Sequence, residues 1–143
     1  MPKQRSAKAF FYEFGQAVYR LDAFYAEFAK KKAVSPTLLW VLYALNDGKA
    51  HTQREICEDW ALPKSTVNTL IQEMKSVNHV ELEPIAGKRR EMTIVLTATG
   101  KMYAEAVLAS LYETEARVFA DLSAEELQIA DLLRRITHRL KSE

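Results

Sequence analysis

The chain has 143 residues and a formal net charge of +1, with hydrophobic and charged residues in the proportions of a soluble globular protein. That length fits one domain, and the near-neutral charge excludes a protein that coats nucleic acid indiscriminately. The single cysteine excludes an internal disulfide and a cysteine-rich zinc site, and no apolar run approaches the roughly 18 residues that span a bilayer.

Two helices are predicted in the first third of the chain. Apolar residues recur at helical spacing over residues 7–32, and lysines gather near the C-terminal end of this segment. A second helix begins at Ser35, a capping residue followed by Pro36 at the first helical position, and runs to Leu45. Because this second helix is apolar almost all round, we expect it to be buried at the centre of the fold.

A helix-turn-helix is predicted next. The capping box formed by Thr52 and Glu55 opens a helix from Gln53 to about Trp60. After a turn at residues 61–63 the second helix of the motif covers residues 65–75, with apolar residues on one side and polar residues on the other. Asn78 tolerates the left-handed conformation and can end this helix as a glycine would.

A two-stranded hairpin is predicted to follow. Val80–Pro84 and Met92–Leu96 alternate apolar and polar residues, and the basic loop 86–90 joins them. His51 and His79 fall in loops on either side of the helix-turn-helix. Two helices followed by a hairpin with a cationic tip are typical of a winged helix-turn-helix, which places one helix in the DNA major groove and the hairpin against the neighbouring backbone.

Two further helices complete the chain. Thr97 caps a helix from Ala98 to about Ala120, and the capping box that begins at Ser123 opens a last helix that ends near Leu140. The apolar faces of the terminal helices exceed what the small hairpin domain can cover, so we expect a homodimer, which would present two reading helices to a palindromic operator. The predicted fold is mainly α with a small β-wing, a single domain 1–143. It comprises a winged helix-turn-helix at about 35–100 and dimerisation helices at about 7–32 and 98–141.

The order of these elements resembles the MarR (multiple antibiotic resistance regulator) family of winged-helix transcription factors. The resemblance covers almost the whole chain and is carried by three segments, Ser65–Ile71, Arg89–Lys101 and Leu122–Leu127. It implies a mainly helical dimer with a small β-wing, held together by the terminal helices and bound to a palindromic promoter site. Such proteins are usually repressors, released by a small anionic or phenolic ligand, by oxidation or by metal.

Three positions depart from the family pattern. Lys88 stands where the wing usually carries an acidic residue that supports the second arginine, Arg90, in the minor groove. This makes the tip more cationic and favours phosphate contact by Arg90. Pro63 replaces a small capping hydroxyl before the recognition helix, and Asn78 replaces the usual glycine after it.

Short polar and cationic side chains on the second motif helix and the wing are the candidate DNA contacts. Asn and Gln suit the edge of adenine, and Lys and Arg can neutralise phosphates or enter a narrow minor groove. The alternatives are a solvated helix face and a hairpin tip kept soluble by its charge. The candidates are Lys64, Ser65, Thr66, Asn68, Thr69, Gln72, Lys75, Lys88, Arg89 and Arg90.

Aromatic residues crowd the first two helices. Most of those on the first helix are expected in the dimer core, because aromatic side chains bury large areas. A second hypothesis is an apolar pocket with one cationic anchor, formed by Arg20, Phe24, Trp40 and Tyr43. Such a pocket would bind a small aromatic or phenolic effector.

Other chemistry is not indicated. Cys57 has no resolving cysteine and no adjacent basic residue, and we expect it to be a small buried hydrophobe. The three histidines lack ligand spacing, so no metal is predicted. There is no catalytic constellation and no cofactor motif, so we expect no enzyme. Polar residues interrupt the N-terminal segment, which argues against a signal peptide, and we expect a cytoplasmic protein with no membrane partner.

Two alternatives to a ligand-responsive DNA-binding regulator remain open. One is a winged-helix protein–protein interaction module that does not read DNA specifically, which the near-neutral charge and Lys88 favour. The other is a related winged-helix family with a different effector.

Overall fold

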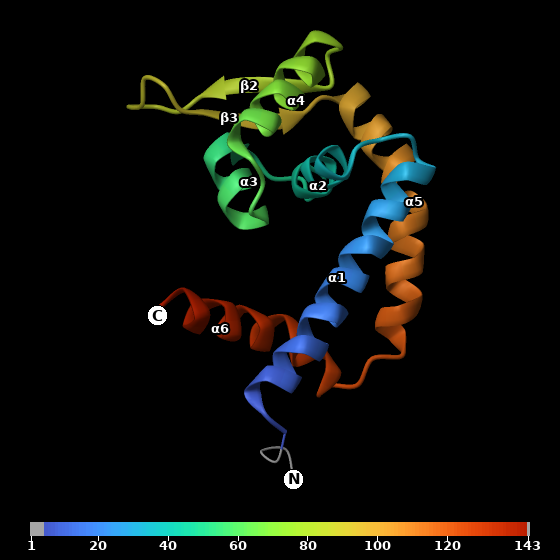
Figure 1. Ribbon diagram of the computed structural model, residues 1–143. Coiled ribbons are helices and arrows are strands. Elements are labelled where there is room, and N and C mark those ends of the chain that lie inside the picture. Colours follow the sequence, from blue (N-terminus) through green and yellow to red (C-terminus); the bar gives the residue numbers. More distant parts are fainter. Residues whose placement is uncertain (1–4, 143) are drawn as a thin grey trace. The chain divides into compact units, whose positions relative to one another are not determined.

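The structure, a computed structural model, describes residues 5–142 and is mainly helical with a small antiparallel sheet, as predicted (Figure 1). Two compact units divide the chain, one ending at Leu108 and one beginning at Ala109. The elements in chain order are α1 (Ala7–Lys31), α2 (Pro36–Leu45), β1 (His51–Thr52), α3 (Gln53–Trp60), α4 (Lys64–Ser76), β2 (Val80–Pro84), β3 (Met92–Leu96), α5 (Ala98–Ala120), η2 (Glu126–Gln128) and α6 (Ile129–Lys141).

Helix α2 forms the centre of the first unit. Its start is fixed by Ser35, whose Oγ accepts a hydrogen bond from the backbone N–H of Leu38 at 3.0 Å. Half of its ten residues are buried, and it packs against α1, α3, α4 and β3. A fully buried leucine stabilises a fold by about 1.5–3 kcal/mol, so this helix supplies much of the core. The prediction of a buried central helix is confirmed.

The helix-turn-helix forms as the capping residues predict. Thr52 accepts a hydrogen bond from the N–H of Glu55 at 3.0 Å and so starts α3. Ala61 ends α3 in the left-handed conformation, with φ 50°. Helix α4 follows Pro63, which makes no side-chain cap, and begins at Lys64, one residue earlier than predicted. Its buried residues are Val67, Ile71 and Met74, which confirms the predicted apolar face.

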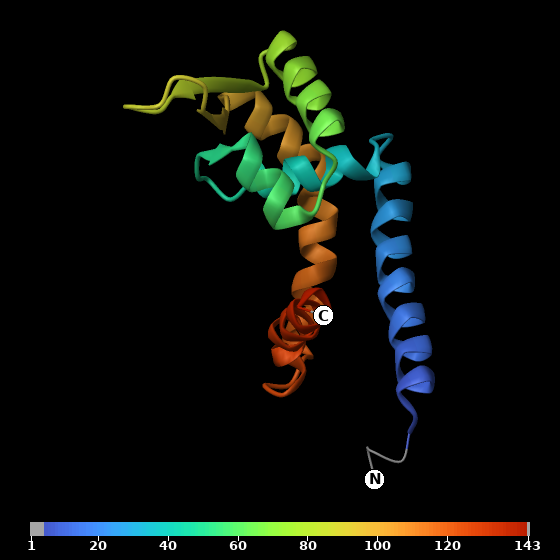
Figure 2. The same ribbon diagram turned by 60° about the vertical axis from the view of Figure 1, so that its left-hand side comes forward.

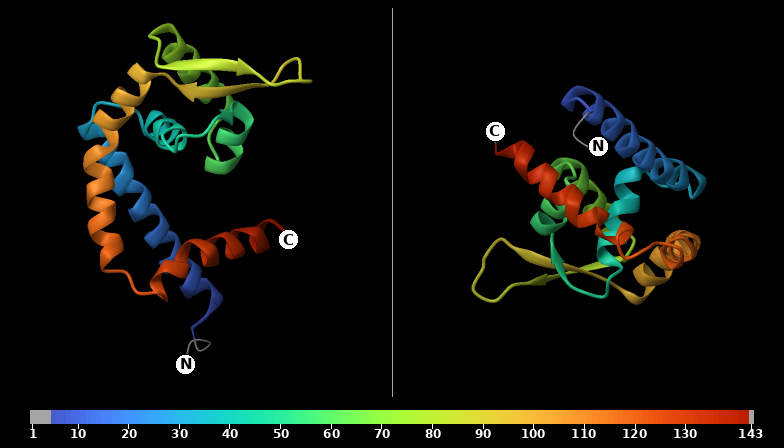
Figure 3. Two further views of the ribbon diagram at one scale, coloured as in Figure 1. Left: turned by 180° about the vertical axis from the view of Figure 1, so that it is seen from behind. Right: turned by 90° about the horizontal axis from the view of Figure 1, so that it is seen from below.

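The predicted hairpin is present, but the sheet has a third strand that was not predicted. Strands β2 and β3 pair in antiparallel register, with Leu82 opposite Ile94, and project beyond α3 and α4 (Figure 3). The other edge of β3 pairs with His51 and Thr52, so the strand order is β1-β3-β2. The expectation that His51 lies in a loop was wrong. Capping α3 requires an extended backbone at Thr52, and that conformation also suits pairing with β3.

A tight junction joins the end of α4 to the start of α5. Thr97 donates its backbone N–H to the carbonyl of His79 at 3.0 Å and its hydroxyl to the carbonyl of Asn78 at 2.6 Å. The same hydroxyl accepts the N–H of Gly100 at 2.9 Å, which confirms Thr97 as the cap of α5. Asn78 has φ 61°, the left-handed conformation that its sequence position predicts. A Cβ on Gly100 would lie 2.7 Å from the carbonyl carbon of His79 and closer still to its oxygen.

The second unit contains the last part of α5, η2 and α6. The predicted capping box forms in full, because Ser123 N–H donates to Glu126 Oε1 at 2.8 Å and Glu126 N–H donates to Ser123 Oγ at 3.0 Å. The predicted helix start at Ser123 was nevertheless wrong, since the box closes a turn and the short η2, and α6 begins only at Ile129. Among the described residues, no helix combines the length and the apolar character that crossing a bilayer requires.

We predict that Gly100→Ala will lower the free energy of unfolding by about 3 kcal/mol, because the added methyl group must displace the His79 backbone. Gly15→Ala in α1 is the control, since a Cβ there meets nothing within 4 Å and alanine favours a helix by about 0.5–1 kcal/mol. Urea unfolding of both variants measures the difference. Equal stability of the two variants would contradict the close approach at Gly100.

Candidate nucleic-acid interface

One face of α4 is exposed and polar. The opposite face, with Val67, Ile71 and Met74, packs into the first unit and fixes the orientation of the helix, which Figure 2 shows along its length. Thr69 differs from the other polar residues because its hydroxyl already donates to the carbonyl of Ser65 at 3.1 Å. All the predicted DNA contacts on this helix are exposed, namely Lys64, Ser65, Thr66, Asn68, Thr69, Gln72 and Lys75, and so are Glu73 and Ser76.

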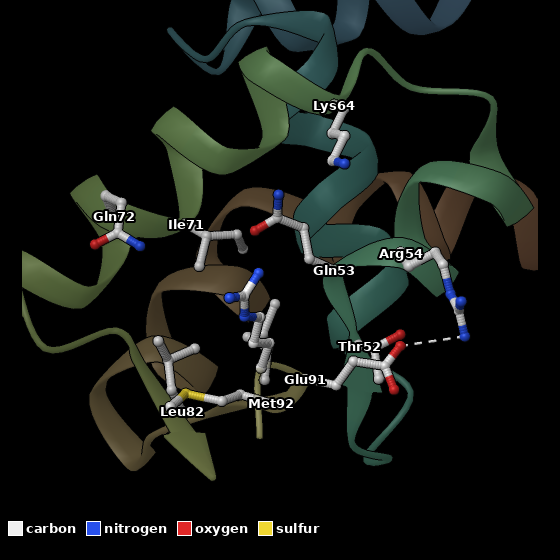
Figure 4. A pocket seen from close by; sticks show the side chains of 11 residues that line it. Thr52, Gln53, Arg54, Lys64, Ile71, Gln72, Leu82, Glu91 and Met92 are labelled. Atoms are coloured by element: carbon white, nitrogen blue, oxygen red, sulfur yellow. Dashed lines mark ion pairs between the residues drawn. The ribbon is translucent and has the colours of Figure 1, made fainter. Parts of the chain in front are cut away.

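A cavity of about 360 Å³ lies between the start of α3, α4 and the wing (Figure 4). Its apolar lining comes from α4, β2 and β3 and includes Ile71, Leu82 and Ile94. Its cations are Arg54, Lys64 and Arg90, one from each of the three elements that surround it. The remaining lining residues are Thr52, Gln53, Gln72, Glu91 and Met92.

The cavity brings three of the predicted DNA contacts together, Lys64, Gln72 and Arg90. It also contains Gln53 and Arg54, which were not among the predicted contacts. Both lie in the first turn of α3, and the first helix of a helix-turn-helix crosses the DNA backbone. That general geometry was the signal available in the sequence, because it predicts a phosphate-binding cation in the first turn of α3.

An ion-pair cluster joins the wing to α3. Glu91 binds Arg54 (Oε1 to Nη2, 3.2 Å) and Lys88 (Oε2 to Nζ, 2.9 Å), and Figure 4 shows the first of these pairs. The hydrogen bond from Lys88, followed by the charges of Lys88 and Arg54, lowers the pKa of Glu91. Glu91 is therefore ionised across the neutral range. Lys88, predicted as a DNA contact, is held by this carboxylate.

The two arginines at the tip of the wing are placed differently from Lys88. Arg89 and Arg90 are exposed, and neither has an ion-pair partner within residues 5–142. Guanidinium groups without an acidic partner can bind phosphate oxygens through bidentate hydrogen bonds. Of the three predicted wing cations, these two are therefore the ones available to DNA.

The predicted effector residues are only partly brought together. Trp40 and Tyr43 belong to an aromatic cluster in which Trp40 stacks on Trp60 at 5.1 Å between ring centroids. Trp60, which the sequence analysis did not select, also contacts Tyr43 at 5.6 Å. Phe24 and Arg20 are exposed residues of α1, and the ring of Phe24 lies against that of Tyr25, with 5.1 Å between the centroids.

A cavity of about 250 Å³ adjoins this cluster at Tyr43 and Trp60. Its polar lining consists of Asp47, Asp59 and His51, so it carries acidic groups where a cationic anchor was expected. His51 Nε2 lies 2.9 Å from a carboxylate oxygen of Asp47. Across the part of the chain that the structure describes, no group of three or more His, Cys, Asp or Glu residues could hold a metal ion.

Cys57 is half-buried, so the expectation that it packs fully inside the helix-turn-helix was wrong. Ile56 takes the inward position on this turn of α3 and is buried. Burial nevertheless raises the pKa of the Cys57 thiol, and the nearby charge of Lys64 opposes that effect without reversing it. A thiol with a raised pKa is a poor nucleophile at neutral pH.

Comparison with known proteins agrees with this architecture. A family model described as MarR family matches residues 34–91, which span α2 to the wing. The structure of NMB1585, a MarR family regulator from Neisseria meningitidis, aligns with a TM-score of 0.77 at 27% sequence identity, covering 91% of this chain and 94% of that one. Residues 34–91 of this chain are therefore of the MarR type, and the chain as a whole resembles a MarR family regulator.

Two further solved structures share the fold. S. aureus MepR in a DNA-binding conformation aligns with a TM-score of 0.70 at 20% identity, covering 93% of this chain and 97% of that one. NadR in complex with 4-hydroxyphenylacetate aligns with a TM-score of 0.75 at 15% identity, covering 95% and 97%. No curated protein sequence matches the chain. Together these matches identify a DNA-binding transcriptional regulator.

We predict that Cys57 reacts with iodoacetamide more slowly than a free cysteine at pH 7.5, because burial disfavours the thiolate. The rate should rise with pH through a midpoint above that of the unfolded chain, because burial raises the pKa of the thiol. Alkylation rates followed by mass spectrometry measure this, with the urea-unfolded chain as control. A midpoint below that of the unfolded chain would mean that an activating charge outweighs burial.

Proposed function

We propose that this protein is a cytoplasmic, ligand-responsive repressor that binds a palindromic promoter site as a homodimer. In this proposal the whole chain acts as one functional domain, with residues 35–100 binding DNA and residues 7–32 and 98–141 forming the dimer. The observation that carries it is the cation-rimmed cavity beside the exposed polar face of α4. Helix α4 enters the major groove, and the wing follows the adjacent backbone.

The cavity suits a segment of phosphate backbone. Arg54, Lys64 and Arg90 surround it from three elements, so a phosphate at its mouth would meet positive charge from several directions. The amide side chains of Gln53 and Gln72 add neutral donors at the same place. With a net charge of only +1, the protein must draw its DNA affinity from local clusters such as this one.

The residues in the middle of the exposed α4 face are the ones that contact the bases in this proposal. Asn68 and Gln72 are exposed and can pair with two atoms of an adenine edge, and Ser65 and Thr66 can contact bases or phosphates. Thr69 contributes mainly its methyl group, because its hydroxyl is bonded to the helix backbone. Lys75 and Arg89 extend the contact to phosphates on either side. Lys88 contributes through the wing's structure.

Exposed apolar surface supports a homodimer. In α1, Tyr12 and Tyr19 are 70% and 76% exposed, and in the second unit Ile129 is 65% exposed. Apolar residues at this density on a protein surface mark an interface. A twofold dimer would cover them and place two α4 helices in successive major grooves, about 34–36 Å apart. The large apolar residues exposed in these regions include Phe11, Val18, Leu21, Phe24, Val118, Phe119, Leu122, Leu127, Leu132 and Leu140.

An effector site is proposed at the aromatic cluster. Trp40 and Tyr43 lie in this cluster, and Arg20 and Phe24 on the neighbouring α1 are the further candidates. The fold relative NadR was captured with 4-hydroxyphenylacetate, a small phenolic acid, which supports an aromatic or phenolic ligand here. Because an effector shifts DNA occupancy only through different affinities for two conformations, it must bind one spacing of the α4 helices better than the other.

Titration of the purified protein against its own upstream intergenic DNA, with salt and nonspecific competitor, tests the proposal. We predict tight binding that weakens steeply with salt and survives competitor. In Arg90→Ala the slope of log affinity against log salt should fall by about one, with similar losses on all sequences. Gln72→Ala should lose about 1–3 kcal/mol on the preferred sequence alone. Lys141→Ala, an exposed lysine of α6, is the control and should leave both unchanged.

Absence of binding even at low salt would contradict DNA recognition and favour the protein–protein interaction module. Binding that competitor abolishes, together with an unchanged Gln72→Ala variant, would contradict sequence readout by α4.

We predict a solution mass of twice the 16.3 kDa of one chain. Leu132→Glu should shift the mass toward the monomer, because a buried interface cannot solvate the new carboxylate. Val77→Glu is the control, since Val77 is also exposed but follows α4 in the DNA-binding region. Light scattering after gel filtration measures all three masses. A monomeric wild type would contradict the homodimer.

A further inference from the structure

We propose that Glu91 is the positioning residue of the wing, a carboxylate that ties the basic loop to α3 and thereby holds Arg90 for DNA contact. This inference rests on the proposed DNA-binding function and adds a residue to it. In the chain, Glu91 lies between the free arginines of the wing tip and the first residue of strand β3.

The geometry makes Glu91 a bridge between two segments. One carboxylate oxygen binds Arg54 in the first turn of α3, and the other binds Lys88 in the wing loop. Its side chain is 29% exposed, whereas those of Arg54 and Lys88 are 67% and 57% exposed. The carboxylate is thus the least exposed member of the cluster, and its two cations come from α3 and from the wing loop.

The α3 end of this bridge is held in place by the sheet. Thr52 pairs with Thr93 of β3 and also caps α3, so Arg54 and Glu91 each lie two residues from a fixed strand pair. The wing end has less support. Gly87 adopts φ 80° and the N–H of Lys88 donates to the carbonyl of Ile85 at 3.1 Å, which closes a turn at the tip. Glu91 therefore connects the start of α3, which the sheet positions, to the wing loop, whose other support is the turn within the loop.

The negative charge of Glu91 allows a positioning role to be distinguished from simple repulsion of DNA. A carboxylate at a DNA-binding surface repels phosphate, so its removal should raise affinity for any duplex if it does nothing else. Glu91 lines the same cavity as Arg54, Lys64 and Arg90, where that repulsion acts most strongly. A loss of affinity on neutralising Glu91 would therefore have the opposite sign to the simple charge effect.

Glu91→Gln tests the proposal, because glutamine keeps the size of the side chain and removes its charge. Glu83→Gln is the matched control, since Glu83 is an exposed acid of the same wing and pairs through its backbone with Thr93. The probes are a duplex selected by the wild-type protein from a random-sequence pool, and poly(dI-dC) as nonspecific DNA. Order parameters of the amides at residues 86–90 are measured by NMR relaxation in the DNA-free protein.

We expect Glu91→Gln to bind the selected duplex about three- to tenfold more weakly and poly(dI-dC) as well as or better than the wild type, because a misplaced wing loses register but keeps its cations. In the DNA-free variant the order parameters of the loop should fall toward values below about 0.6. Glu83→Gln should bind both probes as well as or better than the wild type and leave the loop unchanged.

Two results would overturn the proposal. One is a Glu91→Gln variant that gains affinity on both probes as Glu83→Gln does. The other is a loop whose order parameters do not change. Failure of the wild-type protein to select any duplex would instead contradict the proposed function, and the order parameters would then still decide whether Glu91 holds the wing.

Discussion

The junction between the end of α4 and the start of α5 is the constraint on which the DNA-binding region depends. Thr97 bonds to the backbone of both Asn78 and His79, and Gly100 approaches His79 so closely that no side chain fits between them. His79 also stacks on Tyr103 of α5, with 4.7 Å between ring centroids. Because β2 begins and β3 ends at this point, these contacts together fix the recognition helix, both strands of the wing and the first turn of α5.

The interface follows from that fixed frame. Burial of the apolar residues of α4 leaves its polar face outward, and the strand pairs place the wing and the start of α3 around one cavity. Cations from three elements then converge although the chain as a whole is almost neutral. Glu91 is the negatively charged residue among those that line the cavity. Its two ion pairs explain how an acid can be stable among these cations. The local arrangement of charged side chains, and not the net charge of the chain, therefore determines whether this surface can bind phosphate.

Local sequence signals predicted most of the fold because capping residues act over three or four positions. Ser35, Thr52 and Thr97 each start the helix expected of them, and Asn78 takes the left-handed conformation. The errors have longer-range causes. Strand β1 exists because β3 offers a free edge, and α6 starts late because the capping box closes a turn of its own.

The candidate site was less predictable from sequence than the fold. The exposed α4 residues follow from helical periodicity, and their exposure is confirmed, whereas their contact with DNA stays a prediction. The Arg54–Glu91 pair and the Trp40–Trp60 stack join residues far apart in the chain, which periodicity does not reveal. Exposure of Phe24 and Arg20 likewise depends on how α1 packs, so the effector residues could not be chosen from α1 alone.

The most direct test of the central claim is a hydroxyl-radical footprint of the protein on the duplex it selects from a random-sequence pool. The account predicts protection related by twofold symmetry, with half-site centres one helical turn, about 10–10.5 base pairs, apart or a whole multiple of that. Protection should also extend along the backbone beyond each half-site, where the wings lie. A single unsymmetrical footprint, or a pool in which no sequence is enriched, would contradict it.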